Sequence, residues 1–205
     1  MADKGLIVSI SGPSGVGKGT VLGKVREILP NCASSVSVTT RSPREGEVEG
    51  VAYYFRTKEQ FKQMYADGEI LEYDEYVGNF YGTPAGPLKV MSDEGKDVVA
   101  DLTIPGSLAL KKTFEQAVTI FLLPPSFDVL AERLKGRGTE SDEVIAQRLS
   151  VAKDEMVRAD EFDYVVVNDN LDEAVKKILA IMDAEKCASA RNKEIIGRVT
   201  GREDK

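Results

Sequence analysis

The sequence predicts an α/β fold with a parallel sheet and helices on both of its faces. Short apolar runs alternate along the chain with segments of helical periodicity, which is the pattern of repeated strand–helix units. The first apolar run leads through a glycine-rich turn directly into a helix. The chain of 205 residues is long enough to bury a sizeable interior, either as one domain or as a core with an inserted lobe.

Several apolar runs have the length and composition of buried strands. We expect these strands at residues 6–11, 98–101, 118–123 and 164–168. Helical spacing predicts helices at residues 20–29, 107–114, 126–134, 141–158 and 172–185. Pro30 ends the first helix, because proline cannot continue it.

Residues 34–84 interrupt the alternation, and we interpret them as an inserted lobe with a mixed sheet. The runs SVSVTT, VAYYF and ILEYDEYV have the pattern of half-buried strands. Thr57, followed by Gln60 three residues later, is the signature of a capping box at the start of one helix. Residues 1–33 and 85–185 then form the core.

A second irregular segment, KGRGTESDE, joins two predicted helices through two glycines and charges of both signs. Such a composition is typical of a mobile lid, which we place at about residues 135–150. We interpret the basic tail at residues 186–205 as a solvated or frayed terminus rather than as a binding arm.

Composition excludes several classes of function. The sequence contains no histidine, which removes Ser-His-Asp triads, Cys-His pairs and histidine metal sites. Phosphoryl transfer needs none of these, because it depends on positioning and charge neutralisation. The formal net charge of −7 predicts no general attraction to nucleic acid or to a membrane surface, so an anionic ligand must be held by local cations.

Cys32 and Cys187 have no CxxC or zinc-site spacing, so we expect reduced thiols in a reducing compartment, with a disulfide as the alternative. The first apolar run is short, and no stretch is long enough to span a bilayer. We therefore expect a cytoplasmic protein without a membrane partner. The choice between a monomer and a homo-oligomer stays open.

The stretch GPSGVGKGT has the composition of a phosphate-binding loop. Its glycines allow backbone N–H groups and the N-terminus of the next helix to face an anion, and Lys18 adds a positive charge. A glycine-rich turn with a surface lysine is the alternative, but the flanking strand and helix favour a P-loop of the NTPase type. We expect the nucleotide phosphates to contact Gly12, Ser14, Gly15, Val16, Gly17, Lys18, Gly19 and Thr20.

Magnesium accompanies nucleotide phosphates, and two residues are candidates for holding it. The usual loop has Ser or Thr after its lysine, where the hydroxyl contacts Mg²⁺, whereas this chain has Gly19. Thr20 is the nearest hydroxyl. Asp101 ends an apolar strand, so its carboxylate can reach Mg²⁺ or its waters at the edge of the sheet. A helix cap or loop residue is the other interpretation of Asp101.

The loop is expected to hold ATP as a phosphate donor. A GTPase would need an Asn-Lys-x-Asp motif, but the Asn-Lys pair at Asn192 is followed by Glu194 and Ile195. Arg41 and Arg44, three residues apart, can converge on a second phosphate through forked hydrogen bonds. Spacing alone does not distinguish this role from a solvated loop.

Five motifs occur in order along the chain: TTRSPREGEVEGVAYYF, LEYDEYVGNFYGTP, FLLPPS, ERLKGRGTESDEVIAQRL and DYVVVND. Together they resemble the guanylate kinases, which transfer phosphate from ATP to GMP. The similarity extends from Leu6 to about Glu185, and the motifs are specific to that family rather than to P-loop proteins in general.

The resemblance implies roles for residues of the inserted lobe. Those that would hold the GMP phosphate are Arg41, Arg44, Tyr53 and Tyr81. Those that would read guanine are Ser37, Glu72 and Thr83. The chemistry of Glu72 agrees, because a carboxylate accepts from both the N1–H and the 2-amino group of guanine, a donor pair that adenine lacks. For Tyr53, Tyr81 and Thr83 the alternative is packing within strands.

The resemblance also implies arginines at the transferring phosphate. Arg137 and Arg148, with Arg133 beside them, would stabilise charge on the γ-phosphoryl group, and Asn168 would approach the donor adenine. Exposed helix cations are the alternative for these arginines. The implied catalytic residues are Lys18, Arg41, Asp101, Arg137 and Arg148. The implied fold is a P-loop core with a nucleotide-acceptor lobe and a short helical lid.

One segment departs from the family. After Asp101 the family has aspartate two residues on and glutamine two further, whereas this chain has Thr103 and Pro105. Because a carboxylate and an amide are replaced by a hydroxyl and a proline ring, this segment is not expected to make the family's guanine contact. Two other functions stay open: a guanylate-kinase-like binding module without catalysis, and a kinase for another nucleotide. Lys18 and the arginines argue against the first, and Glu72 argues against the second.

Overall fold

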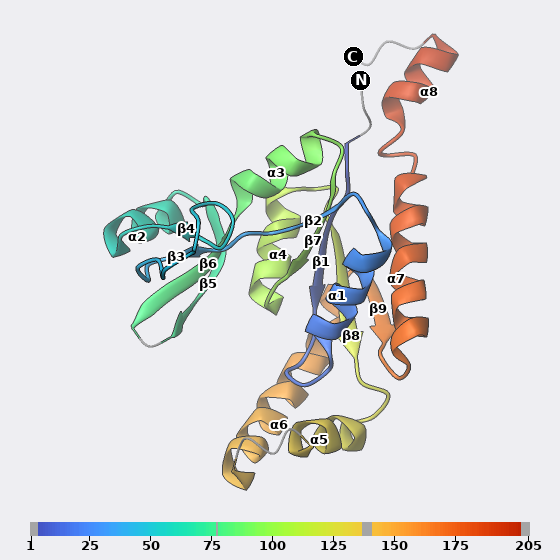
Figure 1. The fold of residues 1–205 in the computed structure, drawn as a ribbon. Helices are drawn as coiled ribbons and strands as arrows, with labels where there is room; N and C mark the ends of the chain where they lie inside the picture. Colours follow the sequence, from blue (N-terminus) through green and yellow to red (C-terminus); the bar gives the residue numbers. More distant parts are fainter. Residues whose placement is uncertain (1–3, 77, 137–140, 202–205) are drawn as a thin grey trace.

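The computed structural model describes residues 4–76, 78–136 and 141–201, except for the side chain of residue 76. Its core is a five-stranded sheet in which neighbouring strands are parallel, in the order β2-β7-β1-β8-β9 (Figure 1). The strands are β1 (Ile7–Ser11), β2 (Cys32–Ser34), β7 (Asp97–Asp101), β8 (Val118–Leu123) and β9 (Tyr164–Val167). The predicted α/β fold with a parallel sheet is confirmed.

Helices cover both faces of this sheet, as expected (Figure 1). One face carries α1 (Lys18–Ile28) and α7 (Leu171–Lys186), and the other carries α3 (Ala85–Asp93) and α4 (Ile104–Thr113). Val8 and Ile10 of β1 join the core under α1 and α7, whereas Ile7 joins Leu88 and Leu110 on the other face. Burial on both faces explains why the core strands are continuous apolar runs.

A second sheet, with strand order β4-β3-β6-β5, projects to one side of the core (Figure 1). It is mixed, as predicted, because β3 pairs in parallel with β4 and antiparallel with β6. The elements of this lobe are β3 (Val38–Thr39), β4 (Tyr54–Phe55), α2 (Lys58–Ala66), β5 (Ile70–Tyr76) and β6 (Asn79–Pro84). Val38, Phe61 and Ile70 form its own small core, and the capping box of Thr57 and Gln60 starts α2.

Two helices lie beyond the carboxyl ends of the core strands, at the bottom of Figure 1. They are α5 (Phe127–Lys135) and α6 (Asp142–Met156), followed by a 3-10 helix, η1 (Val157–Glu161). Leu130 and Leu134 of α5 form a shared core with Ile145 and Ala152 of α6. The predicted lid falls on this pair of helices, but its residues 137–140, with Arg137 among them, lie outside the described residues.

The bounds of two helices in the core differ from those expected from the sequence, and two further elements were not expected. α4 begins at Ile104, earlier than expected, because the Thr103 side chain caps it and Pro105 stands in its first turn. The helix expected at residues 141–158 ends at Met156, where the backbone tightens into η1. α3 and the short edge strand β2 are present without having been predicted.

The tail is more ordered than expected. It contains a helix, α8 (Lys193–Thr200), so of the two expected alternatives, a solvated or a frayed terminus, this segment agrees with the first. The Asn192 side chain donates to the carbonyl of Lys186, and Arg191 donates to the carbonyl of Gln116, which ties the start of α8 to the core. α8 has no buried residue, in agreement with the predicted solvation.

In the described part of the chain, no helix is both long enough and apolar enough to cross a bilayer. Cys32 is half-buried and Cys187 is exposed, and both are free thiols. The alternative of a disulfide is therefore not realised in this structure.

Asp97 joins three elements at the amino end of the sheet. Its side chain accepts hydrogen bonds from the Leu6 backbone N–H at 2.9 Å and from the Lys186 ammonium of α7 at 2.6 Å. Only 11% of this side chain is exposed. We expect Asp97→Ala to lower the free energy of unfolding by about 2 kcal/mol, because it leaves a buried N–H without an acceptor. Urea denaturation measures the change.

Lys186→Ala is the matched control for this prediction. Leu6 keeps its acceptor in that variant, and the Lys186 side chain is 46% exposed, so the expected loss is about 1 kcal/mol or less. A larger loss in Lys186→Ala than in Asp97→Ala would contradict the assignment of the stabilising contact to the backbone N–H.

Candidate active site

The glycine-rich loop lies between β1 and α1, at the carboxyl edge of the core sheet. Gly12, Gly15 and Gly17 have φ angles of +148°, +89° and +98°, which other residues rarely adopt. At Gly12 a side chain is also excluded by space, since a Cβ would lie 2.5 Å from the Leu122 carbonyl oxygen. The loop therefore curls around the N-terminus of α1, whose free N–H groups favour an anion.

The first turn of α1 contains Lys18, Gly19 and Thr20. The Lys18 ammonium donates to the Gly12 carbonyl at 2.5 Å, so its charge lies over the loop. Gly19 and Thr20 are exposed. A Cβ at Gly19 would have no neighbouring heavy atom within 4 Å, so packing does not require glycine at the position that differs from the usual loop.

Asp101 ends β7 directly beside the loop, because the register pairs it with Ile10 of β1. Burial raises the pKa of the Asp101 carboxyl, and the positive charges of Lys18 and Arg26 oppose this shift. Within the described ranges, no group of at least three His, Cys, Asp or Glu side chains could hold a metal by itself. A cation at Asp101 would therefore take part of its ligands from phosphate oxygens or water.

Side chains from α5, from α6 and from the end of β9 contact the loop. Arg148 of α6 donates to the Ser14 hydroxyl at 2.7 Å. Arg133 of α5 approaches the Val16 carbonyl at 3.5 Å, a weak contact. Asn168 is buried and donates to the same carbonyl at 2.8 Å. The structure therefore brings residues that are far apart in the sequence onto one loop.

The Arg41 guanidinium is the centre of a polar cluster in the lobe. It donates to Glu47 Oε1 at 2.8 Å and lies 5.4 Å from the centre of the Tyr53 ring. That ring packs edge-on against Tyr81. Hydrogen bonding to Glu47, and to a smaller extent to Tyr81, raises the pKa of Arg41. Arg44 is exposed, and its backbone N–H donates to Glu47 Oε2 at 2.8 Å.

Sequence reasoning missed Glu47. Its carboxylate accepts from two arginines of one short loop, and this contact lowers the pKa of Glu47. The available signal was its spacing, since Glu47 follows Arg44 by three residues and Arg41 by six. In a charged loop, however, such spacing is equally typical of a solvated acid.

Glu72 of β5 points toward the core and meets the start of α4. Its Oε2 accepts from the Thr103 backbone N–H at 2.9 Å and from the Thr103 hydroxyl. Thr83 of β6 lies 3.5 Å from Oε1. Burial raises the pKa of the Glu72 carboxyl, hydrogen bonds from Thr103 oppose the shift, and the charge of Asp101 adds to it. The contact of Thr103 with Glu72, like that of Glu47 with the two arginines, was not indicated by the sequence.

The remaining lobe candidates lie on the neighbouring strands. The antiparallel register of β3 with β6 pairs Val38 with Gly82, so Ser37 falls opposite Thr83. Tyr81 and Thr83 lie on one face of β6, because alternate residues of a strand face the same side. The structure thus places Tyr81 with the Arg41 cluster and Thr83 with Glu72.

The parallel sheet and the glycine-rich loop after its first strand define a P-loop protein of the NTPase type. A family model described as guanylate kinase matches residues 4–185. The chain belongs to the guanylate kinase family, as the sequence motifs indicate.

Individual relatives agree with this assignment. A guanylate kinase of Lactobacillus delbrueckii subsp. bulgaricus is 50% identical over 193 residues, which cover 93% of this chain and 94% of the relative. A guanylate kinase of Halalkalibacterium halodurans is 48% identical over 189 residues, which cover 92% of this chain and 93% of the relative. The crystal structure of guanylate kinase from Anaplasma phagocytophilum has a TM-score of 0.69 and 32% identity, covering 100% of this chain and 99% of that one.

Gly12→Ala and Gly19→Ala form a matched pair that tests the geometry of the loop. We expect Gly12→Ala to destabilise the protein by more than about 1 kcal/mol, because a Cβ meets the Leu122 carbonyl at a positive φ. Gly19→Ala should stabilise it by about 0.5–1 kcal/mol, because Gly19 lies in a helix with open space around it. Thermal unfolding measures both, and equal effects of the two changes would contradict the described loop.

Proposed function

We propose that this chain transfers the γ-phosphoryl group of ATP to GMP or dGMP, giving ADP and the corresponding diphosphate, in purine nucleotide metabolism. The contact between Glu72 and Thr103 is the observation that carries the proposal. Thr103 follows Asp101 by two residues, so the carboxylate of the lobe lies at the sheet edge that also holds the phosphate loop. A donor at the loop and an acceptor at Glu72 would occupy adjoining places, as direct transfer requires.

The donor end of this site would hold ATP through the loop. Backbone N–H groups of residues 12–20 and the Lys18 ammonium would bind the phosphates, and Asn168 would border the adenine. The carboxylate of Asp101 and the exposed hydroxyl of Thr20 fit a magnesium ion that also takes phosphate oxygens as ligands. Magnesium, when bound, neutralises charge on the β- and γ-phosphates.

The acceptor end would hold the phosphate of GMP in the Arg41 cluster. A phosphate has three strong acceptor oxygens and up to two negative charges, so it can replace Glu47 at the Arg41 guanidinium and at the loop of Arg44. The hydroxyls of Tyr53 and Tyr81 would add hydrogen bonds. Glu72, with Thr83 and Ser37 beside it, would accept from the two adjacent donors of guanine.

The transfer itself would be direct and in line, without a covalent intermediate on the protein. Arg148, which contacts the loop at Ser14, and Arg133 and Arg137 of the lid would stabilise charge on the transferring group. The acceptor phosphate is largely ionised at neutral pH, so no strong general base is needed. Closure of the lobe and lid would exclude water, which would otherwise accept the phosphoryl group.

A reducing compartment fits this function. Cys32 and Cys187 are free thiols, and the described chain has no helix that could cross a bilayer. Free thiols persist where disulfides are kept reduced. We therefore propose that the protein acts in the cytoplasm on small nucleotides.

The first experiment measures ADP release from MgATP with GMP, dGMP, AMP and UMP in separate assays. Turnover that depends on GMP or dGMP supports the proposal. Turnover with AMP or UMP instead would mean that Glu72 does not read guanine. Folded protein that is inactive with all four acceptors would favour the alternative of a binding module.

Lys18→Ala tests the donor site. We expect kcat/KM to fall at least about 100-fold, because the variant loses a cation that lies over the phosphate loop. Steady-state kinetics with varied ATP and saturating GMP measure the effect.

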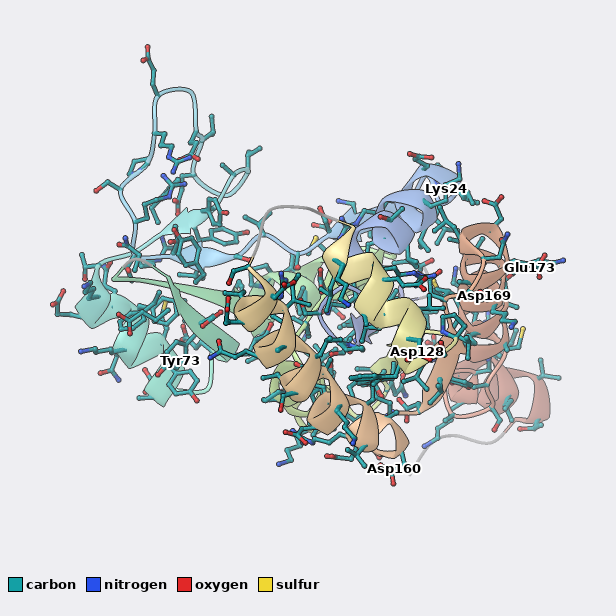
Figure 2. All side chains as sticks on the ribbon, turned by 90° about the horizontal axis from the view of Figure 1, so that it is seen from below. Lys24, Tyr73, Asp128, Asp160, Asp169 and Glu173 are labelled. Atoms are coloured by element: carbon teal, nitrogen blue, oxygen red, sulfur yellow. The ribbon has the colours of Figure 1, made fainter. Side chains whose placement is uncertain are left out.

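Lys24→Ala is the matched control on the same helix. Lys24 pairs with Glu27 at 3.3 Å and lies on the outer side of α1, away from the lid and the lobe (Figure 2). Its removal should change kcat/KM by less than about two-fold, as for other exposed ion pairs. Wild-type activity in Lys18→Ala would rule out the assigned loop.

Arg41→Lys tests the acceptor phosphate site. We expect the KM for GMP to rise about 10- to 100-fold and the KM for ATP to stay unchanged, because lysine cannot form the forked contacts of a guanidinium. Arg56→Lys is the control, since Arg56 pairs with Glu49 at 2.7 Å in the same lobe and should tolerate the change. An equal rise of the KM for GMP in both variants would argue against a specific role of Arg41.

A further inference from the structure

We propose that Thr103 is a positioning residue that holds the Glu72 carboxylate in place for the acceptor base, and that it thereby sets the affinity and selectivity of the acceptor site. The inference rests on the proposed function, because Glu72 must read the base for its position to matter. Thr103 stands where the family pattern has aspartate, so it would act here as a hydrogen-bond donor in place of a second carboxylate.

The direction of the hydrogen bonds supports this role. The Thr103 hydroxyl accepts from the Gly106 backbone N–H at 3.2 Å as the cap of α4. An oxygen that accepts this bond directs its own proton elsewhere, and the acceptor it meets is Glu72 Oε2. The Thr103 backbone N–H donates to the same oxygen at 2.9 Å. Both donors of one residue therefore hold one oxygen of the carboxylate.

The other oxygen keeps most of its capacity to accept. A carboxylate has about four lone-pair sites, two on each oxygen. Thr103 occupies Oε2 twice, whereas Oε1 has, among the residues that the structure describes, only the 3.5 Å contact with Thr83. Glu72 is thus fixed through Oε2, with Oε1 left for the N–H donors of a base. A purine that offers such donors next to each other is the matching ligand.

Gly106 provides an independent constraint on Glu72. A Cβ at Gly106 would lie 2.4 Å from both Cδ and Oε2 of Glu72, so the first turn of α4 is packed directly against the carboxylate. The N-terminus of a helix also favours a negative charge. The same contact joins β5 of the lobe to α4 of the core. Thr103 and Gly106 together define one position of Glu72 relative to the sheet edge.

The test compares Thr103→Val and Thr103→Ser with the wild-type chain, using GMP and inosine monophosphate as acceptors at saturating MgATP. Valine keeps the shape and the backbone N–H but removes the hydroxyl donor, and serine restores it. We expect Thr103→Val to raise the KM for GMP about 10-fold, with kcat and the KM for ATP within about two-fold of wild type. Its preference for GMP over inosine monophosphate, which lacks the 2-amino donor, should fall by a similar factor.

Recovery of the wild-type KM in Thr103→Ser completes the expected result. An unchanged KM for GMP in Thr103→Val, or an equal rise in Thr103→Ser, overturns the inference while leaving the proposed function intact. A wild-type chain that does not turn over GMP overturns both. If Thr103→Val does not fold, Gly106→Ala takes its place: it keeps the hydroxyl, displaces Glu72 and should raise the KM for GMP, and a wild-type KM there also overturns the inference.

Discussion

The parallel pairing of β1 with β7 and β8 is the constraint on which both functional regions depend. Parallel strands end at one edge, so the glycine-rich loop after β1 meets the Asp101 end of β7 without being near it in the sequence. Burial of apolar residues on both faces of the sheet fixes this pairing. The lobe is anchored beside the same edge through Glu72 of β5, whose carboxylate accepts from the backbone N–H of Thr103, two residues beyond the end of β7.

The cations of the site are held by exchangeable partners in a protein whose net charge is −7. Lys18 donates to a backbone carbonyl, Arg148 to a hydroxyl and Arg41 to Glu47. Each partner is an oxygen, and a phosphate oxygen, which is a strong charged acceptor, could take its place at the same donor. Binding of a polyanion, as proposed, would then be an exchange of acceptors by side chains that already point to the loop or the lobe cluster, which would lower the ordering cost.

Local sequence patterns were enough to predict the core strands, the glycine-rich loop and the capping box of α2, because each of these features depends on residues that are neighbours in the sequence. They failed for α3, where Gly86 and Pro87 in the first turn hide the helical periodicity. They also failed for α8, whose start depends on contacts of Asn192 and Arg191 with distant carbonyls. The assignment of residues 34–84 to a separate unit, and the roles of individual site residues, stay predictions.

The sequence by itself determined the fold class, the phosphate loop and the family, since backbone geometry and hydrophobic periodicity are local properties and the motifs lie in order along the chain. Only the tertiary structure decided how Glu72 meets Thr103, 31 residues away, and how Arg148 reaches Ser14, 134 residues away. Hydrophobic burial brings elements together without specifying which polar groups then face each other. The polar pairs Glu72–Thr103 and Arg148–Ser14 follow from the turns and strand registers that place one side chain opposite another. The candidate site is built from such pairs.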